Sequence, residues 1–258
     1  MPPAPPSPPL SYTTAPALLP YTLRFHPYNP AAAREVHHTH RLCVGAAVLS
    51  TPPSPSPNNP PRILLVQRSA QEKALPHRWE LPGGAAESVD SDSFAAAARE
   101  LWEETGLRAK RFAALVGSYQ WDGAGAGVIA TAVPGDQAWG LPNGGVGIVE
   151  TATAGVTTAR AAASEGAVAE AGLATGKDSH KVSKGRDAWR KYTYLVEVET
   201  AADGDVQVVI DPEEHEAFVW ATEEEVRADR CGEVVLEWTS ENQKLDVLKA
   251  LEIAKRKY

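Results

Sequence analysis

The sequence of 258 residues predicts a mixed α/β fold (α/β or α+β) built around a mixed β-sheet. Segments with the apolar or alternating pattern of strands recur along the chain, and segments with helix caps and apolar stripes lie between them. Consecutive strands are often joined by loops rather than helices, which argues against a doubly wound nucleotide-binding fold. The length suits one domain with additions, or at most two small domains.

Composition narrows the class of protein. The formal net charge is −8 and 43% of the residues are hydrophobic, so a core can form and a strong nucleic-acid-binding surface is not expected. The two cysteines, Cys43 and Cys231, are far apart in the sequence and lack metal-ligand spacing. A disulfide framework is therefore not expected, which favours a reducing compartment. The sequence shows neither a membrane-spanning apolar run nor a signal peptide. We therefore expect a cytoplasmic or nuclear protein, with a mitochondrial location as the less favoured alternative.

In the first half of the chain, the proline-rich residues 1–20 predict an extended or disordered tail. Two buried strands are predicted on either side of a proline-rich hairpin loop, because proline cannot donate to a strand ladder. A helix is predicted from Asp92 or Ser93 to Thr105, with Gly106 suited to its end. The strands expected here cover residues 41–50, 62–69 and 110–121.

In the second half, residues from about 122 to 188 are dominated by Gly, Ala, Thr and Val, which predicts a flexible insertion into the domain. Trp121 and Trp189 stand at its two ends. Thr222 and Ser240 are predicted to cap two helices, the second with an apolar stripe. The strands expected here cover residues 189–199, 206–210 and 216–220.

Three glutamates, Glu100, Glu103 and Glu104, crowd one side of the helix predicted to end at Thr105. The spacing i, i+3 and i+4 makes them neighbours, and like charges at that spacing repel. One interpretation is a solvated acidic face. The other is a site for a hard cation, Mg²⁺ or Mn²⁺, for which converging carboxylate oxygens are suitable ligands. The helix alone does not decide between the two.

The longer stretch GGAAESVDSDSFAAAARELWEETGL resembles the Nudix box. That pattern is Gly, five residues, Glu, seven residues, then Arg-Glu-aliphatic-any-Glu-Glu-any-Gly-aliphatic. Gly84 matches the opening glycine, and the run from Arg99 to Leu107 matches the second half in full. The segment between the two is one residue longer than the pattern, and Asp90 or Glu87 is expected to replace its first glutamate. Including RILLVQRS, HRWELPGG and EHEAFVWATEEEV, the resemblance covers roughly 36–121 and 189–258.

Resemblance to the Nudix family implies one Nudix domain over residues 21–258, with its sheet sandwiched between helices and an insertion at about 122–188. It also implies hydrolysis of a nucleoside diphosphate linked to another group, with Mg²⁺ or Mn²⁺ as cofactor. The expected metal ligands are Glu100, Glu103, Glu104 and Gly84, and the expected catalytic residues are Glu103, Glu100 and Arg99. Weaker candidates for substrate binding are Trp79, Arg68 and Glu214, and a general base is sought among Glu213, Glu214 and Glu216.

Two other functions remain open on the sequence. A Nudix-fold binding or regulatory protein without turnover is the main alternative, favoured by the displaced first glutamate and the insertion. An isomerase on the same fold would need a further acid or nucleophile, for which Cys43 in an apolar strand is a poor candidate. The partner expected is a small nucleotide-type diphosphate with no membrane association, and the chain is expected to be a monomer or a homodimer. The fold does not identify the substrate.

Overall fold

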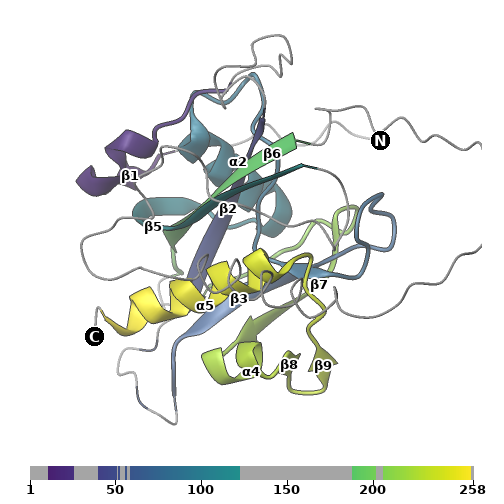
Figure 1. Ribbon diagram of the computed structural model, residues 1–258. Coiled ribbons are helices and arrows are strands. Elements are labelled where there is room, and N and C mark those ends of the chain that lie inside the picture. Colours follow the sequence, from purple (N-terminus) through teal and green to yellow (C-terminus); the bar gives the residue numbers. More distant parts are fainter. Residues whose placement is uncertain are drawn as a thin grey trace, which may run out of the picture.

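The computed structural model describes residues 11–25, 40–50, 52, 56, 59–122, 188–201 and 206–256. A seven-stranded sheet runs through them in the order β1-β5-β6-β2-β3-β4, with β7 paired to β3 (Figure 1). The β2–β6 and β1–β5 pairs are parallel and the others are antiparallel, so the predicted mixed sheet is confirmed. The strands are β1 (Thr13–Thr14), β2 (Arg41–Ser50), β3 (Arg62–Arg68), β4 (Trp79–Glu80), β5 (Ala109–Asp122), β6 (Ala188–Val198) and β7 (His215–Ala221).

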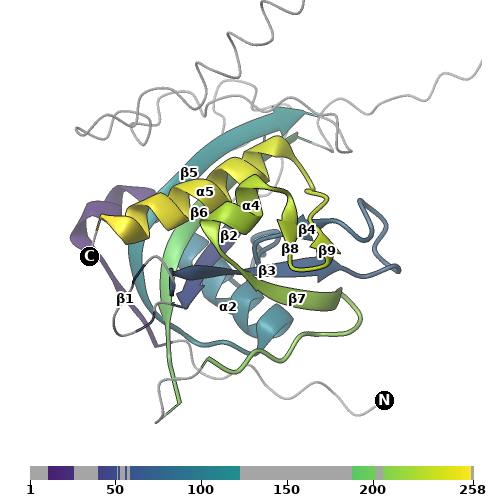
Figure 2. The ribbon, with the colours of Figure 1, turned by 90° about the horizontal axis from the view of Figure 1, so that it is seen from below.

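Helices cover both faces of this sheet, which confirms the predicted sandwich (Figure 2). Helix α2 (Ser93–Thr105) packs on one face, where its Phe94 and Leu101 share a core with Val44 of β2. Helix α5 (Glu241–Lys255) packs on the other face and shares a core with residues such as Ala47. The remaining elements are the 3-10 helix η1 (Pro16–Tyr21), the helix α4 (Glu223–Arg227) and the small hairpin of β8 (Arg230–Cys231) and β9 (Val234–Val235).

The predicted helix limits are confirmed by cap geometry. Asp92 accepts hydrogen bonds from the backbone N–H groups of Phe94 and Ala95, and Gly106 adopts φ 67°, a left-handed conformation that suits glycine. Thr222 begins α4 with a reciprocal capping box, and Ser240 caps α5. These caps fix where α2, α4 and α5 begin and where α2 ends.

Two sequence predictions about local structure are wrong. Residues 11–20 are not a disordered tail, because β1 pairs with β5 and Leu18 of η1 is buried in the core, so the ordered domain begins before residue 21. Residues 206–210 form no strand, because the backbone here caps α2 instead, with the N–H of Val209 donating to the carbonyl of Thr105. Residues 1–10 lie outside the described part of the chain.

The predicted insertion departs from and returns to neighbouring points of the sheet. Trp121 of β5 and Trp189 of β6 are register partners whose rings stack at a centroid distance of 6.3 Å and an interplanar angle of 18°. The guanidinium of Arg41, on β2, lies 4.3 Å from the centre of the Trp189 ring. The insertion itself, residues 123–187, lies outside the described residues, so its predicted flexibility remains a prediction.

Candidate active site

Two of the three glutamates on α2 point into the protein rather than into solvent. Glu100 is 9% exposed and Glu104 is 4% exposed, whereas the side chain of Glu103 is 43% exposed. Burying carboxylates is unfavourable unless they are paired or bind a cation. The solvated acidic face therefore does not describe this helix, and the arrangement fits the second interpretation, a cation site.

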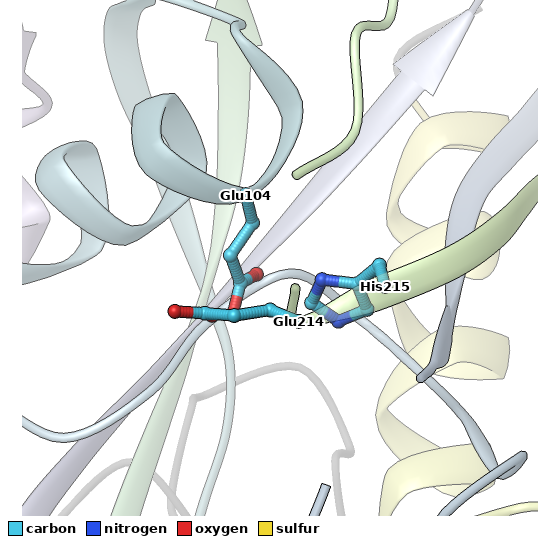
Figure 3. A group of neighbouring side chains, drawn as sticks. All are labelled: Glu104, Glu214 and His215. Atoms are coloured by element: carbon cyan, nitrogen blue, oxygen red, sulfur yellow. The ribbon is translucent and has the colours of Figure 1, made fainter. Parts of the chain in front are cut away.

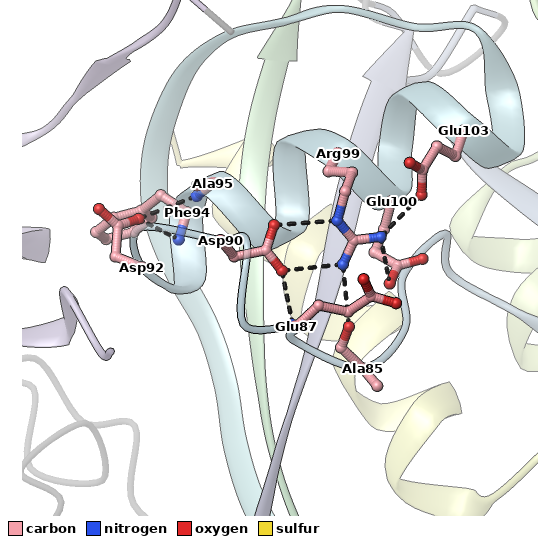
Figure 4. Close-up of polar contacts among 9 residues, drawn as sticks. All are labelled: Ala85, Glu87, Asp90, Asp92, Phe94, Ala95, Arg99, Glu100 and Glu103. Carbon is pink, nitrogen blue, oxygen red and sulfur yellow. Dashed lines mark hydrogen bonds and ion pairs between the residues drawn. The ribbon is translucent and has the colours of Figure 1, made fainter. Parts of the chain in front are cut away.

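Arg99 organises the outer side of the cluster (Figure 4). Its guanidinium donates two hydrogen bonds of 3.0 Å to the carboxylate of Asp90, a bidentate pair, and one of 2.8 Å to Glu103. It also donates to the carbonyl of Ala85 and lies 3.1 Å from a carboxylate oxygen of Glu100. The predicted role of holding a carboxylate in place thus fits the geometry of Arg99.

Two acids could stand in for the missing glutamate of the box. Asp90 is the one whose carboxylate carries the bidentate pair with Arg99. Glu87 contributes its backbone N–H, which donates to Asp90 over 2.8 Å, while Glu87 as a residue is exposed (Figure 4). Because Asp90 keeps the expected offset from Gly84, the extra residue lies between Asp90 and Arg99, and the arginine–carboxylate pair still forms.

A glycine pair brings the backbone close to the carboxylates. The N–H of Gly83 donates to Glu104 over 2.8 Å. A Cβ added to Gly84 would lie 2.7 Å from the carboxylate carbon and both oxygens of Glu100, so only glycine leaves room for that carboxylate. The carbonyl of Gly84 accepts one hydrogen bond from Val44 and keeps a second lone pair, which is compatible with its predicted role as a metal ligand.

The loop before β7 forms the opposite wall of the site. Glu104, Glu214 and His215 each offer a ligand atom, and these atoms lie within 4.8 Å of one another (Figure 3). His215 was missed by the sequence analysis, because a single histidine carries no spacing signal. Of the other general-base candidates, Glu216 instead accepts a hydrogen bond from the backbone of Ala70 and contacts His77, and Glu213 is exposed.

The two remaining substrate-binding candidates differ in position. Arg68 pairs with Glu80 over 2.6 Å and with Glu72, so its guanidinium lies among carboxylates beside the site. Trp79 is only 1% exposed and packs in the core under α5, so its assignment to substrate stacking is wrong. The aromatic ring fills the space between the sheet and α5, a role that its sequence position before the Pro-Gly-Gly turn did not reveal.

Burial favours the uncharged form of each of these side chains when no cation is bound. It raises the pKa of Glu100 to about 7, against the opposing effect of Arg99, and it raises the pKa of Glu104 well above its usual range. It also raises the pKa of Glu214, with Asp211 adding to the effect, and it lowers the pKa of His215. A divalent cation would replace the protons on the glutamates.

The raised pKa of Glu100 predicts a pH-dependent stability in the metal-free protein. Between its ordinary pKa of 4.5 and about 7, the folded state binds more protons at Glu100 than the unfolded chain does. The free energy of unfolding should therefore fall with rising pH across this window. Relative to a Glu100→Gln variant, the wild type should lose stability between pH 5 and pH 7.5, measured by urea unfolding with EDTA. Equal pH profiles for the two proteins would contradict this assignment.

Comparison with known proteins identifies the same region. Residues 40–128 match the model of the NUDIX domain. A MutT NUDIX hydrolase from Burkholderia pseudomallei is 17% identical, with 82% of this chain and 95% of that chain covered and a TM-score of 0.41. An ADP-ribose pyrophosphatase from Streptococcus suis is 15% identical, with 85% and 96% covered and a TM-score of 0.40. An Ap4A hydrolase from C. elegans is 11% identical, with 84% and 99% covered and a TM-score of 0.41. No curated protein matches the chain.

Proposed function

We propose that this chain, which carries a NUDIX domain over residues 40–128, hydrolyses the diphosphate bond of a nucleoside diphosphate linked to another group. The observation that carries the proposal is the burial of Glu100 and Glu104 beside the Gly83–Gly84 turn, with Glu103 held by Arg99. A carboxylate-lined site repels an anionic diphosphate. A divalent cation is therefore needed to join the two.

The residues present fit such a cation. Glu100, Glu103 and Glu104, together with the Gly84 carbonyl, would hold Mg²⁺ or Mn²⁺ through oxygen atoms, which these ions prefer. A bound ion of this kind supplies charge neutralisation at phosphate oxygens and a nucleophile from water. Because Gly84 has no Cβ, the Glu100 carboxylate can lie close to the backbone at this position.

The chain's own groups have distinct tasks in this proposal. Arg99 positions Glu103, and the Gly83 N–H positions Glu104, so that both carboxylates approach the substrate in fixed orientations. Glu214 lies close to Glu104, so it is better placed than Glu213 and Glu216 either to act as general base or to bind the cation (Figure 3). Arg68, beside the site, is a candidate for contact with substrate phosphates.

The helices of the chain agree with a reaction on a small molecule that needs no membrane span. Among the described residues, no helix is long and apolar enough to cross a bilayer. The proposed partner is a small nucleotide-type diphosphate, the proposed location cytoplasmic or nuclear, and the proposed assembly a monomer or a homodimer.

The proposal is tested with a panel of nucleoside diphosphate derivatives in Mg²⁺ or Mn²⁺. We expect the wild type to release phosphorylated fragments, resolved by chromatography. A Glu103→Gln, Glu104→Gln double variant should be slower by a factor of about 100 or more, because two cation ligands lose their charge. Glu224→Gln, at an exposed glutamate of α4, is the matched control and should retain activity.

The outcome separates the two candidate functions. If the folded wild type binds the metal and a nucleotide but cleaves nothing in the panel, the hydrolase proposal is wrong and a binding role takes its place. A rearranged product without phosphorylated fragments would indicate an isomerase.

A further inference from the structure

His215 is a buried side chain with no visible structural task. It is 2% exposed, and neither ring nitrogen has a hydrogen-bond partner among the described residues. Buried polar atoms are nearly always hydrogen-bonded to protein or water, so an imidazole with two unpartnered nitrogens calls for a ligand. Figure 3 shows the ring beside the carboxylate of Glu104.

We propose that His215 completes, with Glu104 and Glu214, a mixed nitrogen–oxygen site for a transition metal ion of the manganese-to-zinc series. This inference deepens the proposed function, on which it rests in part, because Glu104 belongs to both sets of ligands. It adds a nitrogen ligand to a site whose other ligands are oxygens.

The separations in this group suit a bridging cation rather than direct contact. The three ligand atoms lie within 4.8 Å of one another, yet His215 makes no hydrogen bond to either carboxylate. A metal ion with bonds of about 2.1 Å holds its ligand atoms roughly 3 to 4 Å apart. The 4.8 Å within which the three atoms lie is somewhat wider, so the side chains would rotate inward to bind one ion.

Backbone contacts hold the three residues in place. The N–H of Asp211 donates to the carbonyl of Glu104 over 3.1 Å, and the N–H of His215 donates to the carbonyl of Asp211 over 2.8 Å. Ser69 holds the loop from its other side, because its N–H donates to the carbonyl of Glu214 over 2.8 Å. Backbone hydrogen bonds thus link the end of α2 to the start of β7 next to the three proposed ligands.

The nitrogen ligand determines which ion is favoured. Imidazole is a good ligand for zinc, cobalt and related ions, whereas Mg²⁺ binds almost entirely through oxygen. Glu100 and Glu103 offer only oxygens and remain suited to Mg²⁺. The proposed site should therefore discriminate between the two kinds of ion through one residue, His215.

The first experiment measures the nitrogen directly. Full-length protein saturated with Mn²⁺, so that the oxygen ligands of α2 do not compete for the ion, is examined by pulsed electron paramagnetic resonance, which detects coupling of the ion to a directly bound ¹⁴N. We expect such coupling in the wild type and in a His37→Gln, His38→Gln double variant, which controls for the histidine-rich stretch near the N-terminus. Mn²⁺ bound without ¹⁴N coupling would overturn the proposal, and this measurement requires no change at the site.

The second experiment measures affinity. In His215→Gln, the affinity for Co²⁺ or Zn²⁺ in calorimetry should fall by about 10-fold or more, whereas the affinity for Mg²⁺ should change less than about twofold. His77→Gln is the control, since His77 pairs with Glu216 outside the group. Equal losses for Co²⁺ and Mg²⁺ would show a structural role only. Hydrolysis without ¹⁴N coupling refutes this inference alone, and coupling without hydrolysis refutes the proposed function alone.

Discussion

Gly83→Ala is expected to destabilise the domain by roughly 3 kcal/mol or more, through backbone strain and overpacking together. Gly83 has φ 145°, which side chains rarely adopt, and an added Cβ would lie 2.2 Å from the carbonyl oxygen of Val44. Because that neighbour is backbone within the sheet, it cannot move aside cheaply. The measurement is urea unfolding of the metal-free protein.

Gly84→Ala is the matched variant and should affect function more than stability. Its Cβ would meet the carboxylate end of Glu100, which can rotate away, so most of the stability should remain. The displaced carboxylate should weaken Mg²⁺ binding by about 10-fold or more. If Gly84→Ala unfolded as readily as Gly83→Ala, or bound Mg²⁺ as well as the wild type, the assigned roles of the two glycines would be wrong.

Asp90→Ala is expected to lower the free energy of unfolding by about 2–3 kcal/mol, because it leaves a largely buried arginine without its bidentate partner. The side chains of Asp90 and Arg99 are 3% and 13% exposed. This loss is smaller than is usual for a broken buried ion pair, because Arg99 keeps its contacts with Glu100 and Glu103. Hydrolysis should also slow, since Arg99 would position Glu103 less firmly.

Glu87→Ala tests the other candidate for the missing box glutamate. It should change stability by less than about 0.5 kcal/mol, because Glu87 is exposed and its contact with Asp90 uses only the backbone. A loss as large as that of Asp90→Ala would reverse the assignment. Asp90→Asn, which keeps the size but removes the charge, separates the loss of the ion pair from the loss of packing.

Sequence patterns predicted the parts of this fold where several local signals agree. Helix α2 carries a cap at Asp92, an apolar stripe and Gly106 at its end, and its predicted limits are confirmed. Residues 206–210 show an alternating pattern, yet they form no strand, and their backbone caps α2 instead. Alternation alone does not reveal which partner a segment will find.

The site was predictable in part, since the sequence also placed Glu214 of the loop before β7 among its candidates. The α2 glutamates and Arg99 stand in a short continuous motif, so spacing was enough to select them. His215 and Glu104 lie more than a hundred positions apart in the sequence and meet only through the loop before β7. Trp79 shows the opposite error, since its aromatic side chain suits base stacking and core packing equally well, and only its burial decides for the core.

The paired strand ends at Trp121 and Trp189 have a consequence for how this chain tolerates change in length. Because the sheet already holds the two ends side by side, the entropy of closing the intervening segment grows only slowly with its length. A short turn could replace residues 123–187, or another whole domain could be spliced between these tryptophans, without moving the strands. We therefore expect the segment between these two strand ends to vary in length without displacing the glutamates of α2.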